Sequence, residues 1–319
     1  MRFALMIEPQ QGLTYNEQLA IALRAEAAGF EALLRSDHYD SFLGGSGQPT
    51  SDAWAVLAGL ARDTTVIGLG TLVSPVLFRY PGNLAKVAAT VDEMSGGRVE
   101  VGVGAGWHEH EHRGHGFAFP PLAERADHLE EALEILRGLW DGPDGWSFSG
   151  QHYQVADAGF RPKPSSLPVR AGRRIPIITG GQGSPRAYRI AARHADEFNL
   201  SSTTPSAASA KFAALDDACR AIGRDPGTLV HSVMAGVCVA RDAAGVAARE
   251  ADLLRALGAN GDADAWLAER RPRWIHGTPD QARAQVAAFA AVGAERIVLQ
   301  DFLPRDLAMI DEAAEFLFG

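Results

Sequence analysis

The sequence predicts an α/β protein in which eight parallel strands close into a barrel, because strand and helix patterns alternate along the chain. Short apolar runs rich in β-branched residues recur, and most are followed by segments with apolar residues at helical spacing. This alternation favours parallel strands joined by right-handed crossovers. The length of 319 residues is common for single barrels. We therefore predict one barrel domain over residues 1–319, with an open doubly wound sheet as the alternative.

The first half of the chain repeats the strand–helix pattern without interruption. Four apolar runs read as strands, at 3–7, 30–35, 66–72 and from 98 onward. Apolar positions at helical spacing predict helices between them at 16–28, 52–62 and 81–94. Gly29 ends the first of these helices, and Pro81 begins the third at a position where its missing N–H breaks no hydrogen bond.

The second half continues the pattern with longer interruptions. Four further strands bring the total to eight: 175–179, 197–200, 229–239 and 297–301. Helices are expected at 122–139, 185–194, 207–222, 280–292 and 306–318. We expect residues 142–174 to form a long irregular segment, and residues 243–271 to be helical or irregular. We also expect the barrel to carry loop insertions at its carboxyl-terminal rim.

Composition narrows the function classes. The chain is 46% hydrophobic and 22% charged, which is ordinary for a soluble globular protein. Its net charge of −9 argues against nucleic-acid and anionic-membrane partners, which attract basic surfaces. Two cysteines do not make a disulfide framework, and no apolar run is long enough to span a bilayer. We therefore expect a cytoplasmic protein.

Polar and charged groups follow most of the predicted strands. The residues that directly follow the strands of a barrel share one rim, and the active sites of barrel enzymes lie at that rim. The rim candidates are Glu8, Asp37, His38, residues 71–74, 104–112 and 179–184, Asn199, Ser201 and Asp301.

Asp37 and His38 are the strongest candidates for proton transfer. A neutral histidine can give or take a proton near pH 7, and a neighbouring carboxylate can orient its ring. The alternative is that Asp37 caps the following loop and His38 only packs.

Two glycine-rich stretches suggest ligand contacts. Glycines 102, 104 and 106 end a strand without side chains, so that a flat or anionic ligand could approach the backbone. Residues 179–184 precede a helix, whose free N–H groups and positive end suit an anion. A plain sharp turn is the alternative in both places. Leu72 and Val73, followed closely by Pro75, indicate a strand end or a bulge beside a ligand.

Four histidines crowd the segment after residue 106, at positions 108, 110, 112 and 115. Alternate histidines share one face of an extended strand, as zinc ligands do, whereas on a helix His108 and His112 share a face. No second ligand motif accompanies them, so we predict no metal. A metal-dependent hydrolase remains the alternative that zinc in the purified protein would indicate.

Together these motifs resemble, in order and spacing, the luciferase-like monooxygenase superfamily, and within it the oxidoreductases that use the deazaflavin coenzyme F420. The resemblance runs over roughly residues 2–199. The matching segments are 36–38, 68–71 with 78–81, 95–98, 102–107 with 111–112, 148–153, 162–164, and 180–181 with 191–196.

The resemblance implies a (β/α)8 TIM barrel that holds a flavin-like ring in its rim pocket. It implies a bulge with a non-proline cis peptide at Leu72 and Val73, behind the ring, and a cofactor-phosphate site at residues 180–183. It gives His38, Asp37 and Glu111 as catalytic candidates. The cofactor-binding candidates are Asp37, Thr71, Leu72, Val73, Gly106, Trp107, Thr179, Gly180, Gly181, Gln182 and Gly183.

The implied reaction is hydride transfer between C5 of F420 and a small organic substrate. His38 would transfer a proton or bond the developing charge, with Asp37 orienting it and Glu111 as a second proton-transfer group. In the sugar-phosphate dehydrogenases of this branch a glutamate stands near the position of Trp107, so their substrate is not carried over. The alternatives are an FMN-dependent two-component monooxygenase and a flavin-binding protein without turnover. Family members are usually homodimers.

Overall fold

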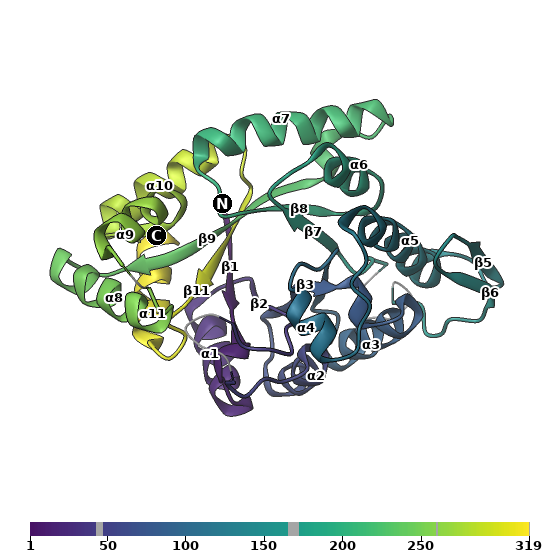
Figure 1. Ribbon diagram of the computed structural model, residues 1–319, viewed down its shortest axis with the longest axis horizontal. Helices are drawn as coiled ribbons and strands as arrows, with labels where there is room; N and C mark the ends of the chain where they lie inside the picture. Colours follow the sequence, from purple (N-terminus) through teal and green to yellow (C-terminus); the bar gives the residue numbers. More distant parts are fainter. Residues whose placement is uncertain (43–46, 165–171, 260, 319) are drawn as a thin grey trace.

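The structure, a computed structural model, describes residues 1–42, 47–164, 172–259 and 261–318 (Figure 1). Eight parallel strands pair in a closed ring, because β9 pairs with β8 on one side and β11 on the other, and β11 pairs with β1. The open doubly wound sheet is thereby excluded. The barrel strands are β1 (Arg2–Ile7), β2 (Ala32–Arg35), β3 (Gly68–Pro75), β4 (Val99–Gly104), β7 (Ile177–Gly181), β8 (Glu197–Ser201), β9 (Val230–Val239) and β11 (Arg296–Asp301).

Helices surround the strands, as Figure 1 shows. They are α1 (Tyr15–Ala28), α2 (Ala53–Asp63), α3 (Pro81–Ser95), α5 (Leu122–Asp141), α6 (Pro185–His194), α7 (Pro205–Ala221), α8 (Ala243–Ala256), α10 (Pro279–Ala291) and α11 (Leu307–Leu317). Most follow the predicted ranges within a few residues. No helix among the described residues is both long and apolar enough to cross a membrane.

Two layers of apolar side chains alternate along each strand. Phe3, Leu5 and Ile7 belong to the large cluster shared with the helices, whereas Ala4 and Met6 belong to a smaller cluster with side chains of β2, β3, β7 and β11. Successive residues of a strand point to opposite faces, so the smaller cluster fills the barrel interior. Among the described residues, the barrel interior is therefore filled with apolar side chains.

A buried ion cluster closes the amino-terminal end of the barrel. Arg296, which begins β11, is 1% exposed and lies 2.8 Å from Glu100 and 2.9 Å from Glu197. Glu31, immediately before β2, is its third carboxylate partner. Burial raises the pKa of Glu31, against the attraction of Arg296. This end is filled with charge pairs, which leaves the carboxyl-terminal rim for the site.

Three elements depart from the sequence prediction. The stretch 142–174, expected to be irregular, contains an antiparallel hairpin of β5 (Trp146–Ser149) and β6 (Gln154–Ala158). A short helix, α4 (Glu109–Gly114), carries part of the histidine-rich segment. After α8, α9 (Ala263–Arg270) and the 3-10 turn η6 (Arg271–Arg273) lead into a short strand, β10 (Ile275–Gly277), which pairs with β9. Parts of the predicted rim loops, residues 43–46 and 165–171, lie outside the described residues.

Candidate active site

A cavity of about 700 Å³ opens at the carboxyl-terminal rim of the barrel. All eight barrel strands, or the residues directly after them, contribute to its wall, and α9 with η6 forms the remaining side. Seven of the catalytic and cofactor-binding candidates line it: His38, Leu72, Val73, Gly106, Trp107, Gly180 and Gly181. The expected rim residues Glu8, Asn199 and Ser201 line it too. The sequence therefore located the cavity through the segments that follow β2, β3, β4 and β7.

The bulge expected on β3 is present. Pairing with β4 shifts register between Thr71 and Ser74, and the peptide bond between Leu72 and Val73 is cis. Leu72 and Val73 both line the cavity, so the bulge forms an apolar wall. Thr71, one residue earlier, is fully buried and donates its hydroxyl to the carbonyl of Gly102 at 2.9 Å. Thr71 therefore holds β3 to β4 and does not line the cavity.

The glycines of β4 make room for this bulge. A Cβ at Gly102 would lie 2.1 Å from the carbonyl oxygen of Thr71, and one at Gly104 would lie 2.6 Å from Cγ2 of Val73. The expectation that both positions were open for a ligand is thus wrong for Gly102, which the neighbouring strand fills. Gly104 lines the cavity while also clearing Val73. Gly106 lines the cavity with a positive φ of 78°.

Asp37 and His38, adjacent in sequence, lie in different environments. Asp37 is fully buried and accepts hydrogen bonds from Ser74 Oγ at 2.6 Å and Arg79 Nη1 at 2.5 Å. Its described partners do not include His38, so the expected orienting contact between the two is absent. The carboxylate instead forms an ion pair with Arg79 beneath the bulge. Arg79 also pairs with Asp52.

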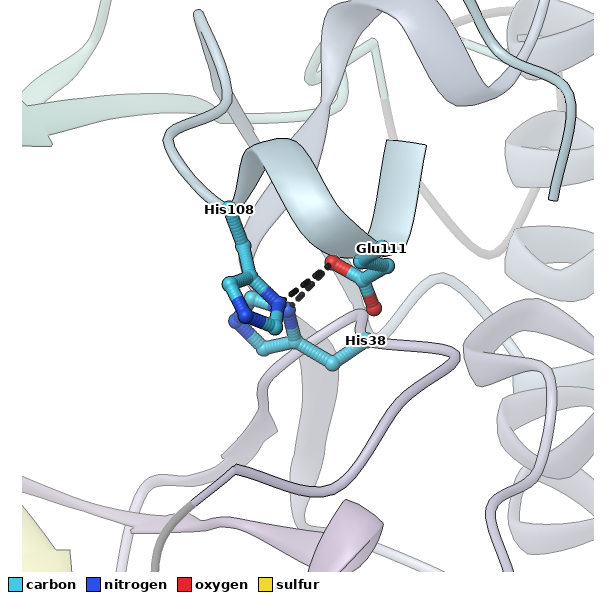
Figure 2. Close-up of side chains that lie close together, drawn as sticks. All are labelled: His38, His108 and Glu111. Carbon is cyan, nitrogen blue, oxygen red and sulfur yellow. Dashed lines mark hydrogen bonds and ion pairs between the residues drawn. The ribbon is translucent and has the colours of Figure 1, made fainter. Parts of the chain in front are cut away.

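Glu111, from α4, supplies the carboxylate contact to His38. His38 Nδ1 lies 2.9 Å from Glu111 Oε2 (Figure 2). The other oxygen of Glu111 accepts the backbone N–H of Tyr39 and, at 3.1 Å, that of Asp40. The Glu111 side chain is completely buried, whereas that of His38 is 11% exposed and reaches the cavity. The pair thus connects a buried carboxylate to a ring at the cavity wall.

The environment of Glu111 favours its charged form. Burial alone would raise the pKa of Glu111, but the hydrogen bond and charge interaction with His38 and the N–H groups of Asp40 and Tyr39 lower the pKa below its usual value. An ionised Glu111 accepts a hydrogen bond from Nδ1 of His38 and orients its ring.

His108 joins this pair from the amino-terminal end of α4. Its Nδ1 lies 3.8 Å from Glu111 Oε2, and Figure 2 shows both imidazoles directed at the carboxylate. Burial lowers the pKa of His108, partly offset by attraction to Glu111. Two imidazoles and a carboxylate are also the donor types of a metal site. Here, however, His38 and Glu111 already bond each other directly, which is the contact that acid–base chemistry uses.

The loop from β7 to α6 forms the end of the cavity where an anion was expected. Gly180 and Gly181 line the cavity, and the space around a Cβ at Gly181 is open. Gln182 turns away and donates to the Ser201 hydroxyl at 3.1 Å, while Gly183 makes room for the ring of Tyr188. Thr179 is buried, and its hydroxyl has no partner among the described residues. Two of these candidates thus face the cavity, and the others shape the loop.

Other cavity residues had little or no signal in the sequence. Glu8 follows β1 and is held by Gln10 at 2.7 Å and Gln300 at 2.5 Å; its position after a strand was the only indication. Arg270 and Arg273 line the opposite side of the cavity. They come from a segment with no recognisable motif, and only the fold brings them to the rim.

Comparison with known proteins agrees with this architecture. A model of the luciferase-like monooxygenase family matches residues 1–298. An F420-dependent glucose-6-phosphate dehydrogenase from Microbacterium testaceum is 34% identical over 213 residues, covering 66% of this chain and 60% of that protein. The chain spans only about half to three-fifths of the first curated relatives.

The chain is also similar to a monooxygenase and to an F420-dependent dehydrogenase of known structure. A pyrimidine monooxygenase, RutA, from an Enterobacter species is 30% identical over 275 residues, covering 82% of this chain and 70% of that protein. The solved structure of an F420-dependent secondary alcohol dehydrogenase with an F420–acetone adduct superposes with a TM-score of 0.81 at 21% identity, covering 99% and 98% of the two chains. At that identity the likeness establishes the fold.

Proposed function

Because the chain belongs to the luciferase-like monooxygenase family, we propose that it is an oxidoreductase that binds coenzyme F420 in the rim cavity and acts on a small organic molecule. The hydrogen-bonded pair of His38 and Glu111 at the cavity wall carries this proposal. The F420-dependent relatives support the cofactor. A single domain, a homodimer and a cytoplasmic location remain part of the same proposal.

The cavity suits a flat ring with an anionic tail. Leu72 and Val73 offer an apolar wall on one side of the ring position, and Trp107 stands at the rim with 62% of its surface exposed. At Gly181 the absence of a side chain leaves open space beside the helix start of α6, where N–H groups favour anions. These residues would hold the ring and the phosphate of the coenzyme.

When bound, F420 supplies hydride transfer at its C5. The protein's own part is orientation and proton control. His38 would hold or transfer a proton at its ring, with Nδ1 bonded to Glu111 and Nε2 left for the substrate or the ring edge. Glu111 would stabilise the protonated histidine, and the apolar wall would exclude water from one face of the ring.

Binding tests the cofactor assignment. The purified protein is titrated with F420 and separately with FMN, and tryptophan fluorescence reports binding because Trp107, Trp266 and Trp274 line the cavity. We expect tight binding of F420 and weak binding of FMN. The reverse order would favour the second candidate, an FMN-dependent two-component monooxygenase, which the similarity to RutA supports. Binding of neither would contradict both.

Turnover tests the roles of the pair. With a panel of alcohols, ketones and unsaturated carbonyl compounds, we expect Glu111→Gln to lower kcat by about 100-fold or more, because the proton on His38 loses its charged partner. F420 affinity should stay within about threefold, since Glu111 does not line the cavity.

Glu109→Gln is the matched control. Glu109 lies on the same short helix but is exposed and pairs with Arg113 at 2.7 Å. Its replacement should leave kcat unchanged. Equal kcat in the Glu111→Gln variant and the unaltered protein would contradict the proposed role.

A further inference from the structure

A second group of metal-binding side-chain types lies outside the cavity, between α5 and the β5–β6 hairpin. Glu124 and His128 are four residues apart on α5 and so share one face of the helix. His152 lies in the loop between β5 and β6. One potential ligand atom from each of the three side chains lies within 4.8 Å of the other two. Figure 1 places this hairpin on the outside of the barrel, away from the strand ends.

The two imidazoles face each other closely. Their ring centroids are 3.9 Å apart at an interplanar angle of 31°. Nδ1 of His128 and Nε2 of His152 are both buried, and neither has a hydrogen-bond partner among the described residues. A buried nitrogen without a partner is unfavourable, and a bound cation would satisfy both.

A second carboxylate fixes the loop that carries His152. Glu131 lies one turn after His128 on α5 and accepts the backbone N–H groups of Gln151 at 2.7 Å, His152 at 3.0 Å and Tyr153 at 3.0 Å. The ring of Tyr153 packs edge-on against His128 at 5.2 Å. Glu131 is therefore a positioning residue, which places His152 beside His128 before any ligand arrives.

The types of ligand atom and the local charge indicate which metal ion this group of side chains would bind. Two imidazoles with one carboxylate suit zinc, whereas magnesium and calcium prefer oxygen ligands throughout. In a tetrahedral zinc site the ligand atoms lie about 3.3 Å apart, a separation that follows from zinc–ligand bonds of about 2.0 Å. Glu124 is exposed in the first turn of α5, so its side chain is free to close that distance. Asp127 and Glu131 add negative charge near His128.

We infer that Glu124, His128 and His152 bind a zinc ion that fastens the β5–β6 hairpin to α5. The three protein ligands leave one coordination position for water. The inference does not depend on the proposed oxidoreductase activity, because the site shares no residue with the cavity.

Zinc binding to the metal-free full chain tests this inference, measured by calorimetry and by the absorption spectrum of the Co²⁺ form. We expect His128→Gln and His152→Gln each to raise the zinc Kd at least tenfold and to remove one equivalent of tetrahedral Co²⁺. His110→Gln, which replaces an exposed histidine outside both metal-type groups, should change neither. Hydrogen exchange at residues 150–153 should slow on adding zinc to the unaltered chain and not to His128→Gln.

Three further variants separate the alternatives. His108→Gln tests the group beside the cavity, and zinc binding that is lost in this variant but retained in His128→Gln would overturn the inference. So would the absence of zinc binding at micromolar concentration. Glu131→Gln should weaken zinc binding several-fold without abolishing it, and Glu134→Gln, an exposed carboxylate on the same helix, should leave binding unchanged.

Discussion

At the residue scale, Asp37 and His38 show how adjacent side chains divide into structural and chemical roles. They follow the end of β2, where successive side chains point to opposite sides. His38 therefore reaches the cavity while Asp37 turns beneath the bulge to Arg79. Sequence reasoning identified His38 and Glu111 as candidates, but not that they meet. Seventy-three positions separate them, and only the path of α4 across the rim brings them together.

Replacing Asp37 should lower stability, because it leaves the buried charge of Arg79 without its fully buried partner. We expect Asp37→Asn to reduce the free energy of unfolding by about 3 kcal/mol. Asp52→Asn removes the other partner of Arg79, but the Asp52 side chain is 38% exposed, so the expected loss is about 1 kcal/mol or less. Urea denaturation of both variants measures the difference. Equal losses would show that Arg79 does not depend on Asp37 in particular.

At the element scale, the bulge on β3 and the glycines on β4 form one unit. The break near Pro75 and the glycine repeat were both visible in the sequence, and the resemblance placed the bulge correctly at Leu72 and Val73. What the sequence did not show is that Gly102 serves the neighbouring strand and not a ligand. That distinction depends on the inter-strand register. The β5–β6 hairpin was missed because its strands are only four and five residues long, too short for their alternation to stand out within a long connecting segment.

Gly102→Ala should displace the bulge, since the added Cβ would lie 2.1 Å from a backbone oxygen that cannot rotate away. We expect a loss of about 3 kcal/mol in unfolding free energy together with weaker F420 binding. Gly82→Ala in the first turn of α3 is the control, because a Cβ there meets nothing within 4 Å, and it should be neutral or stabilising by about 0.5 kcal/mol. Thermal unfolding and F420 titration check both outcomes. Native stability with unchanged cofactor affinity in Gly102→Ala would refute the close-packing argument.

At the scale of the whole molecule, buried ion pairs fill the amino-terminal end of the barrel, and the cavity lies at the carboxyl-terminal end. The eight strands were predictable as apolar runs, but their closure was not determined by them, because the same pattern fits an open doubly wound sheet. The pairing of β9 with both β8 and β11 shows the closure. The ion cluster around Arg296 was not predictable. Its partners come from three separate strand starts, and no local pattern distinguishes a buried arginine from the many exposed ones.

Arg296→Met should destabilise the barrel most strongly at neutral pH. It leaves three carboxylates together without their cation, for an expected loss of about 3–5 kcal/mol. Burial already raises the pKa of Glu31, and removing Arg296 raises it further. A carboxyl with a raised folded-state pKa binds more protons folded than unfolded, so the loss should shrink as pH falls from 7.5 to 5.5.

Urea denaturation at the two pH values measures this, with Arg2→Met as the control. Arg2 lies 3.8 Å from Glu31 and its side chain is 46% exposed, so its replacement should change the unfolding free energy by less than about 1 kcal/mol at either pH. A loss in Arg296→Met that grows as the pH falls would contradict the account.

The two sides of the cavity have different origins. Strand ends tied into the barrel build the side that carries the bulge, His38 and Gly181, whereas α9 and η6 build the other side as one continuous segment. Trp266 and Trp274 of that segment pack edge-to-face beside Cys238 and Leu253, in a small cluster separate from the barrel core. If the proposed function holds, we therefore expect the segment of α9 and η6 to influence substrate preference separately from cofactor binding. Replacing this segment with that of another family member should then change which substrates are accepted and leave F420 affinity unchanged.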